Sequence, residues 1–124
     1  MRRVVVHAGS CQSEPPILGL LEAEGFDVVA CPDARALLEE VMQRAPDSVI
    51  YALQANCHED LGVLQLMRRA IPDVPLVLLA CEDSLETRRL TQSLRPTYYA
   101  MCPVDGAELL EVMRATLTRR GRTP

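Results

Sequence analysis

The chain contains no lysine and no tryptophan, and its apolar runs are short. All 13 basic residues are arginine, which excludes any mechanism that needs an ammonium side chain. A membrane-spanning helix requires a run of ~20 apolar residues, and the sequence has none. The apolar stretch after Arg2 and Arg3 is also too short for a signal peptide. We therefore predict a soluble, cytoplasmic protein.

Acidic residues outnumber basic ones, which gives the chain a net charge of −4. Broad affinity for nucleic acids comes from a basic surface that neutralises phosphates. The charge balance therefore predicts that this domain does not bind nucleic acid directly, and the short apolar runs predict no membrane contact.

The cysteines form no recognisable metal or disulfide pattern. There are five of them, an odd number with no CxxC spacing: Cys11, Cys31, Cys57, Cys81 and Cys102. This disfavours a disulfide framework and a structural zinc site. We expect reduced thiols, no metal and no cofactor.

What is present is an alternation of short apolar runs with stretches of helical period. At 124 residues the chain suits a single domain, which we place at 1–120 with a polar tail at 121–124. Strands are predicted near residues 3–8, 26–30, 47–53, 74–80 and 97–102, each followed by a helix.

Capping residues and apolar stripes place the helices. Asp33 is the expected N-cap of the second helix, and capping boxes begin at Asp83 and Asp105 for the fourth and fifth. The first helix is expected to start near Ser13 and to stop at Gly25. Two helices have predicted buried stripes, namely Ala34, Leu37, Leu38, Val41 and Met42 in the second and Val63, Leu66, Met67 and Ala70 in the third.

The first, third and fourth predicted strands are continuously apolar, as strands covered by helices on both faces must be. They belong in the middle of a parallel sheet. Right-handed crossovers then give a three-layer, doubly wound α/β fold whose working edge lies at the carboxyl ends of the strands.

Three stretches carry a resemblance to a known family: 46–53 (PDSVIYAL), 72–80 (PDVPLVLLA) and 99–105 (YAMCPVD). Together with the order of elements, they make the chain similar to the receiver domain of two-component response regulators. The resemblance implies a (βα)5 flavodoxin-like fold with strand order 2-1-3-4-5, a role in signal transduction, and a cis bond before Pro103.

The positions that carry phosphorylation chemistry in that family differ in this chain. Ala52 stands where the family has the phosphate-accepting aspartate, and His7 and Ala8 stand where it has the acidic pair that holds magnesium. Ala80 replaces the threonine or serine, and Cys102 replaces the lysine. The resemblance therefore implies a degenerate receiver, or pseudo-receiver, that is not an enzyme.

A receiver without phosphorylation would act by contact with other proteins. The resemblance places a surface for a protein partner or a homodimer on the helix after residue 83, the strand at 97–102 and the helix after residue 105. The candidate interface residues there are Arg88, Arg89, Leu90, Tyr98 and Tyr99.

Two alternatives stay open. In the resemblance, Cys11, Cys81 and Cys102 lie near one edge of the sheet, where they would form a thiol-based redox or metal sensor. The loop that contains Gly9 precedes a helix, and its backbone N–H groups would bind a small anionic ligand. A doubly wound domain of unrelated use is the further alternative to the resemblance itself.

Overall fold

The structure is a computed structural model that describes residues 2–9, 13–14, 16–53, 58–81 and 84–122. Five parallel strands form its main sheet. They are β1 (Arg3–His7), β3 (Asp27–Ala30), β4 (Ser48–Leu53), β5 (Leu76–Ala80) and β6 (Tyr98–Met101). Their spatial order is β3-β1-β4-β5-β6, so the predicted order 2-1-3-4-5 is confirmed.

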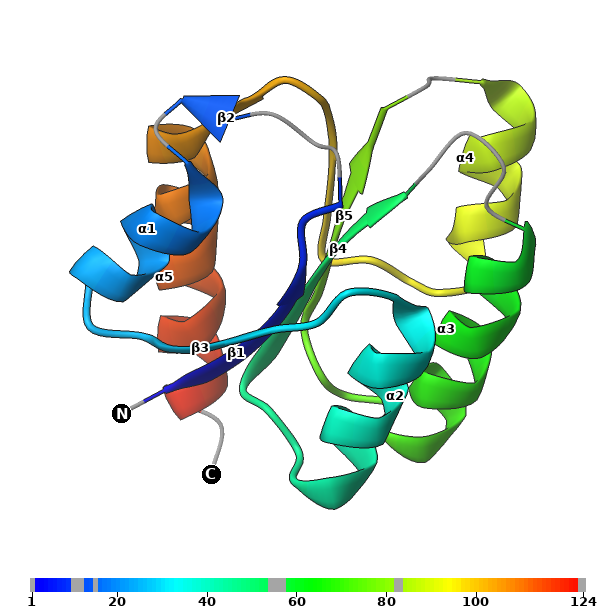
Figure 1. Cartoon of the computed structure of the whole chain (residues 1–124), viewed down its shortest axis with the longest axis horizontal. Helices are drawn as coiled ribbons and strands as arrows, with labels where there is room; N and C mark the ends of the chain where they lie inside the picture. The colour runs from blue at the N-terminus through cyan, green and yellow to red at the C-terminus, as the bar shows by residue number, and fades with distance from the viewer. Residues whose placement is uncertain (1, 10–12, 15, 54–57, 82–83, 123–124) are drawn as a thin grey trace.

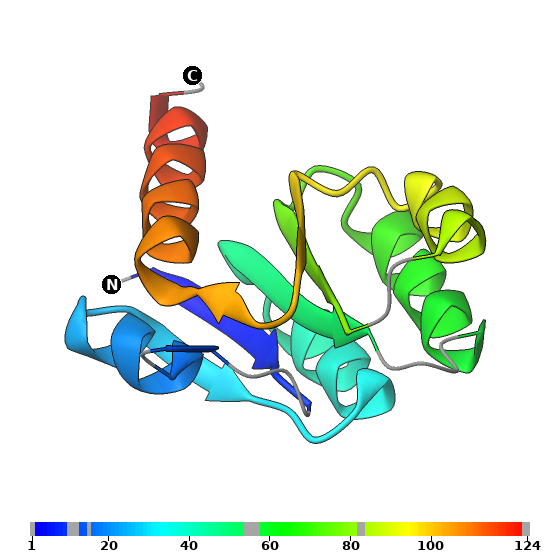
Figure 2. The same cartoon turned by 90° about the horizontal axis from the view of Figure 1, so that it is seen from above.

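Helices cover both faces of this sheet, as the apolar strands require. They are α1 (Ile17–Ala23), α2 (Ala34–Gln43), α3 (His58–Ala70), α4 (Leu85–Gln92) and α5 (Gly106–Arg122). Figures 1 and 2 show α1 and α5 on one face and the other three helices on the opposite face. The last helix continues to Arg122, past the predicted domain boundary at residue 120.

Each face of the sheet has its own hydrophobic core. Alternate residues of β4 serve the two sides: Ile50 and Ala52 pack toward α1 and α5, whereas Val49 and Tyr51 pack toward α2 and α3. Every residue of β1, β4 and β5 is buried. The continuous apolar character of these three segments therefore reflects their central positions.

The predicted start of the first helix is wrong. Ser13 and Glu14 form a short strand, β2 (Ser13–Glu14), which pairs in parallel with β7 (Val104–Asp105) in a second sheet of two strands. The helix begins only at Ile17, after Pro16. A residue that precedes proline favours the extended region, and Glu14 precedes a proline, which explains the strand. The helix ends at Ala23, close to the predicted stop at Gly25, which has the left-handed φ of +91°.

The predicted buried stripe of α3 is wrong for two of its four members, since Met67 is buried and Val63 packs against the core. Its buried apolar residues are Leu61, Leu64 and Met67, whereas Leu66 is 54% exposed and Ala70 is also exposed. The helix has apolar residues on two different sides, and its packing against β4 and α2 decides which side is buried.

The stripe of α2 is confirmed apart from its last member. Leu37 and Val41 are buried, whereas Met42 is 61% exposed. Met42 follows Val41 by one residue, which turns its side chain about 100° away around the helix axis.

The helix caps match the prediction in two of three cases. Asp33 accepts a hydrogen bond from the backbone N–H of Ala36 (2.8 Å), and Asp105 accepts one from that of Ala107 (3.0 Å). The predicted cap of the fourth helix, Asp83, lies outside the described residues. There Ser84 is the N-cap, because its hydroxyl accepts from the N–H of Thr87 at 3.0 Å.

Candidate functional site

The predicted site positions lie at the carboxyl ends of neighbouring strands. His7 ends β1 and is paired with Tyr51, one residue before Ala52 in β4. Ala80 ends β5 and is paired with Leu53, one residue after Ala52. The structure therefore brings His7, Ala52 and Ala80 to one edge of the sheet, as the resemblance implied.

Ala52 offers no reactive group at this edge. Its side chain is fully buried and belongs to the core beneath α1 and α5. Ala80 is buried as well, so the end of β5 supplies a methyl group rather than a hydroxyl.

The fold holds the His7 side chain in a buried position. It is 7% exposed, and its Nδ1 lies 2.9 Å from the carbonyl oxygen of Cys31, to which it donates a hydrogen bond. The imidazole also packs against the ring of Tyr51, with 4.7 Å between ring centroids. With Nδ1 and one ring face in use, His7 acts as a structural residue here.

Two carboxylates, Glu59 and Asp60, lie in the first turn of α3, the helix that follows β4. Glu59 and Asp60 line a cavity of about 180 Å3 between the starts of α2 and α3, together with Asp33 and Arg35. Within the described part of the chain, there is no group of three or more His, Cys, Asp or Glu side chains that could hold a metal ion. Glu82 lies outside the described residues.

Cys102 is disulfide-bonded, so the expectation of reduced thiols is wrong for this residue. The backbone N–H of Cys102 donates to the carbonyl oxygen of Ala80 (2.9 Å), and the bond to Pro103 is cis, as the resemblance implied.

Of the other cysteines, Cys31 and Cys81 are free, and Cys11 and Cys57 lie outside the described residues. Cys81 is half-buried and directly follows Ala80, which is paired with Met101, so Cys81 and Cys102 are neighbours at the ends of β5 and β6. Cys31 is buried, and burial, together with the nearby Glu40, raises the pKa of its thiol. Of the predicted thiol cluster, the structure thus places two members side by side.

The predicted interface residues are on α4 and on the edge strand β6. The guanidinium of Arg88 lies over the ring of Tyr99, 5.6 Å from its centroid, in a cation–π contact. Arg89 is exposed and Leu90 is half-buried against the core. The most exposed apolar residue of this surface, Leu85 (80% exposed), was not among the predicted interface residues.

Tyr98 faces the other side of the sheet and contacts α5. Its hydroxyl donates a 2.8 Å hydrogen bond to Glu108, and this bond, with burial and nearby carboxylates, raises the pKa of the phenol above 10.0. Glu108 was predicted only as a member of a capping box. The order of strand and helix along the chain brings Glu108 near Tyr98. No sequence pattern indicates the hydrogen bond between them.

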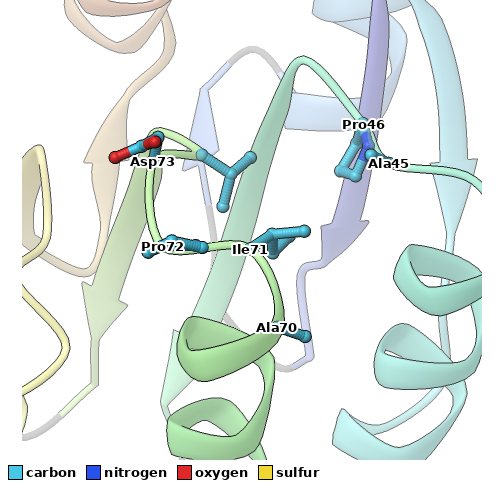
Figure 3. Close-up of a pocket in the computed structure, with 7 residues that line it drawn as sticks. Ala45, Pro46, Ala70, Ile71, Pro72 and Asp73 are labelled. Carbon is cyan, nitrogen blue, oxygen red and sulfur yellow. The ribbon is translucent and has the colours of Figure 1, made fainter.

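A second cavity, of about 240 Å3, lies at the opposite edge of the sheet, where β4 and β5 begin. Figure 3 shows Ala45 and Pro46 on one side and Ile71 on the other, with the Asp73 carboxylate turned away from Ala45 and Pro46. The lining is mostly apolar and lies far along the strands from the predicted site positions.

In the part of the chain that the structure describes, none of the helices combines the length and apolarity needed to cross a lipid bilayer.

Comparison with known proteins identifies the fold. The chain superposes on a response regulator receiver domain protein (CheY-like) from Methanospirillum hungatei with a TM-score of 0.83 and 19% identity, over 98% of each chain. It also superposes on a response regulator protein from Burkholderia multivorans with a TM-score of 0.77 and 22% identity, over 95% of each chain. The chain therefore has the fold of response regulator receiver domains.

Sequence comparison finds regulators that are longer than this chain. The transcriptional regulatory protein PrrA of Mycobacterium tuberculosis is 26% identical over 103 residues, which are 83% of this chain and 44% of PrrA. The nitrogen assimilation regulatory protein NtrX of Azorhizobium caulinodans is 30% identical over 73 residues, 57% of this chain and 16% of NtrX. The matched region thus spans less than half of these relatives, and no protein-family model matches the chain.

Proposed function

We propose that this chain is a signalling domain of the receiver fold that acts through protein contacts without being phosphorylated. One observation carries the proposal, which is the buried Ala52 near the end of β4. The resemblance places the phosphate-accepting aspartate at this position, and a methyl group has no atom that can attack phosphorus.

The surrounding positions support the same conclusion. Phosphoryl transfer to a carboxylate needs oxygen ligands for magnesium, a hydroxyl or amide donor, and a cation beside the transferred group. His7 is engaged by Cys31 and Tyr51, Ala8 and Ala80 carry methyl groups, and Cys102 is disulfide-bonded. Because every one of these components is replaced, restoring a single one would not restore the reaction.

The face formed by α4, β6 and α5 is the proposed contact surface, and we propose a second copy of this chain as its occupant. α4 carries Glu86, Arg88 and Arg89, and α5 carries Glu108, so both signs of charge are present on the elements of this face. A two-fold interface uses the same patch on both subunits, and a patch with both signs can be complementary to itself. The exposed Leu85 adds apolar area.

Incubation with Mg2+ and a small phosphodonor tests the absence of phosphorylation. We expect the intact mass of the wild-type chain to stay unchanged, while an ordinary receiver domain in the same tube gains one phosphoryl group. The Ala52→Asp variant should also stay unmodified, because its carboxylate would lack metal ligands and a cation. A stoichiometric phosphoprotein from the wild-type chain would overturn the proposal.

Sedimentation velocity over a range of concentrations tests the contact surface. We expect self-association that Arg88→Glu weakens, that Arg69→Glu on α3 leaves unchanged, and that beryllofluoride with Mg2+ does not alter. A wild-type monomer at all concentrations would refute the second copy as the occupant.

A further inference from the structure

We propose that Cys81 and Cys102 form a thiol–disulfide exchange pair at the ends of β5 and β6, in which the disulfide of Cys102 transfers to Cys81. Cys102 is disulfide-bonded, whereas Cys81 is free and half-buried. Both cysteines belong to the described part of the chain. Exchange requires a free thiol beside a disulfide sulfur, and the ends of these two strands supply both groups.

The register of β5 and β6 sets the two cysteines opposite each other. Ala80 is paired with Met101 in parallel strands, and Cys81 and Cys102 are the next residues of each segment. The backbone N–H of Cys102 donates to the carbonyl oxygen of Ala80 (2.9 Å), so the hydrogen bonding between the two segments continues as far as Cys102. Neighbouring strands lie about 4.8 Å apart, which falls within the ~4.4–6.8 Å between Cα atoms that a disulfide spans.

The alternation of side chains places both cysteines on the same face of the sheet. Leu79 and Ala100 are paired, and both contact the core beneath α1 and α5. Cys81 follows Leu79 by two residues and Cys102 follows Ala100 by two, and residues two apart in a strand share a face. Cys102 packs against that same core, as the alternation requires. The two sulfur atoms are therefore on one side of the sheet as well as at one level of it.

The exchange needs no added oxidant or reductant. The thiolate of Cys81 attacks the Sγ atom of Cys102, and the new Sγ–Sγ bond forms between these two residues. The bond from Cys102 to its present partner breaks, and that sulfur leaves as a thiolate. The proton that Cys81 loses passes through solvent to the departing thiolate. One disulfide and one thiol exist before and after the step, so electrons and protons balance.

The new bond would join the segments that lead into two neighbouring helices. α4 begins at Leu85, four residues after Cys81, and α5 begins at Gly106, four residues after Cys102. Transfer of the disulfide thus changes which segment is covalently tied to the start of α5. This inference does not rest on the proposed docking function, and its tests measure disulfide connectivity alone.

Peptide mapping of the wild-type protein tests the exchange. The full-length chain is held at pH 8, acidified, alkylated under denaturing conditions and digested with trypsin without reduction. Cys81 is then on the peptide that ends at Arg88 and Cys102 on the peptide that ends at Arg114, and neither contains another cysteine. We expect these two peptides to be recovered as a linked pair that reduction separates. Complete alkylation of Cys81 in the held sample would overturn the proposal.

A variant with Cys11→Ser and Cys57→Ser tests the pair by itself, because only Cys31, Cys81 and Cys102 remain. Oxidised glutathione should form the Cys81–Cys102 disulfide with loss of two alkylatable thiols, while the small disulfide is reduced to two thiols. Adding Cys81→Ser should instead leave glutathione bound to Cys102, and adding Cys31→Ser, the matched control, should leave the pair intact. Glutathione retained on Cys102 beside an alkylated Cys81 in the double variant would refute the pairing.

Discussion

The side chain of Arg68, on α3, connects this helix to two loops. Its guanidinium is largely buried, and burial together with the nearby Arg95 lowers its pKa. It donates hydrogen bonds to four backbone carbonyl oxygens, those of Leu94 (2.7 Å), Val74 (2.6 Å), Pro72 (3.2 Å) and Arg95 (3.2 Å). These carbonyls belong to the loops that precede β5 and β6, so one side chain fixes the chain just before each of these two strands begins.

We therefore predict that Arg68→Ala lowers the free energy of unfolding by about 3 kcal/mol, because buried carbonyls lose their donors. The matched control is Arg69→Ala, which removes an exposed arginine from the same helix and should change stability by less than about 0.5 kcal/mol. Urea denaturation of both variants measures the difference. Equal effects of the two substitutions would contradict the assigned role of Arg68.

Several properties of individual residues could not be read from the sequence. Arg68 and Arg69 are adjacent and chemically identical, and only the packing of α3 buries one of them. In contrast, Ala52 and Ala80 could be assigned in advance, because the apolar strands that contain them belong to stretches that carry the resemblance.

At the scale of elements, short apolar runs between stretches of helical period identified all five strands of the main sheet. The three central strands are continuously apolar because helices bury both faces of that sheet. The short β2 was missed because a strand of two residues, Ser13 and Glu14, has no measurable period. The rotation of α3 about its axis was predicted wrongly. Leu61 and Leu64 form one apolar side of the helix and Val63 and Leu66 form another, so the sequence does not show which side is buried. Local patterns thus predicted the number and type of the main elements better than their rotation and ends.

The edge strand β6 is joined to α5 by the hydrogen bond from Tyr98 to Glu108. The raised pKa means that folded protein holds the phenolic proton more strongly than unfolded protein does. The stabilisation is therefore fully present below the unfolded pKa of about 10 and is lost as the pH rises through the higher folded value.

We accordingly predict that Tyr98→Phe lowers the unfolding free energy by about 1 kcal/mol at pH 8. Above pH 10 the difference between wild type and variant should shrink, because the wild-type phenol then ionises beside a carboxylate. Urea denaturation of both proteins at pH 8 and at pH 11 measures this change. A difference that stays constant with pH would show that the hydrogen bond is not the source of the effect.

At the scale of the whole molecule, one sheet separates two hydrophobic cores. Leu37 of α2 belongs to one core and Leu109 of α5 to the other, and both side chains are buried. The strands between them contribute alternate residues to each side, so neither core can form unless the sheet is in place. Unfolding should therefore be a single cooperative transition even though the cores do not touch.

Leu37→Ala and Leu109→Ala test this coupling. Each should cost about 2–5 kcal/mol, because a cavity replaces a buried leucine, and the double variant should show the sum to within about 0.5 kcal/mol, since the sites share no partners. Leu66→Ala, at a position 54% exposed on α3, is the matched control and should have little effect. Far-ultraviolet and tyrosine circular dichroism should give coincident unfolding curves for every variant. If Leu109→Ala split these curves, the face beneath α1 and α5 would unfold separately from the rest.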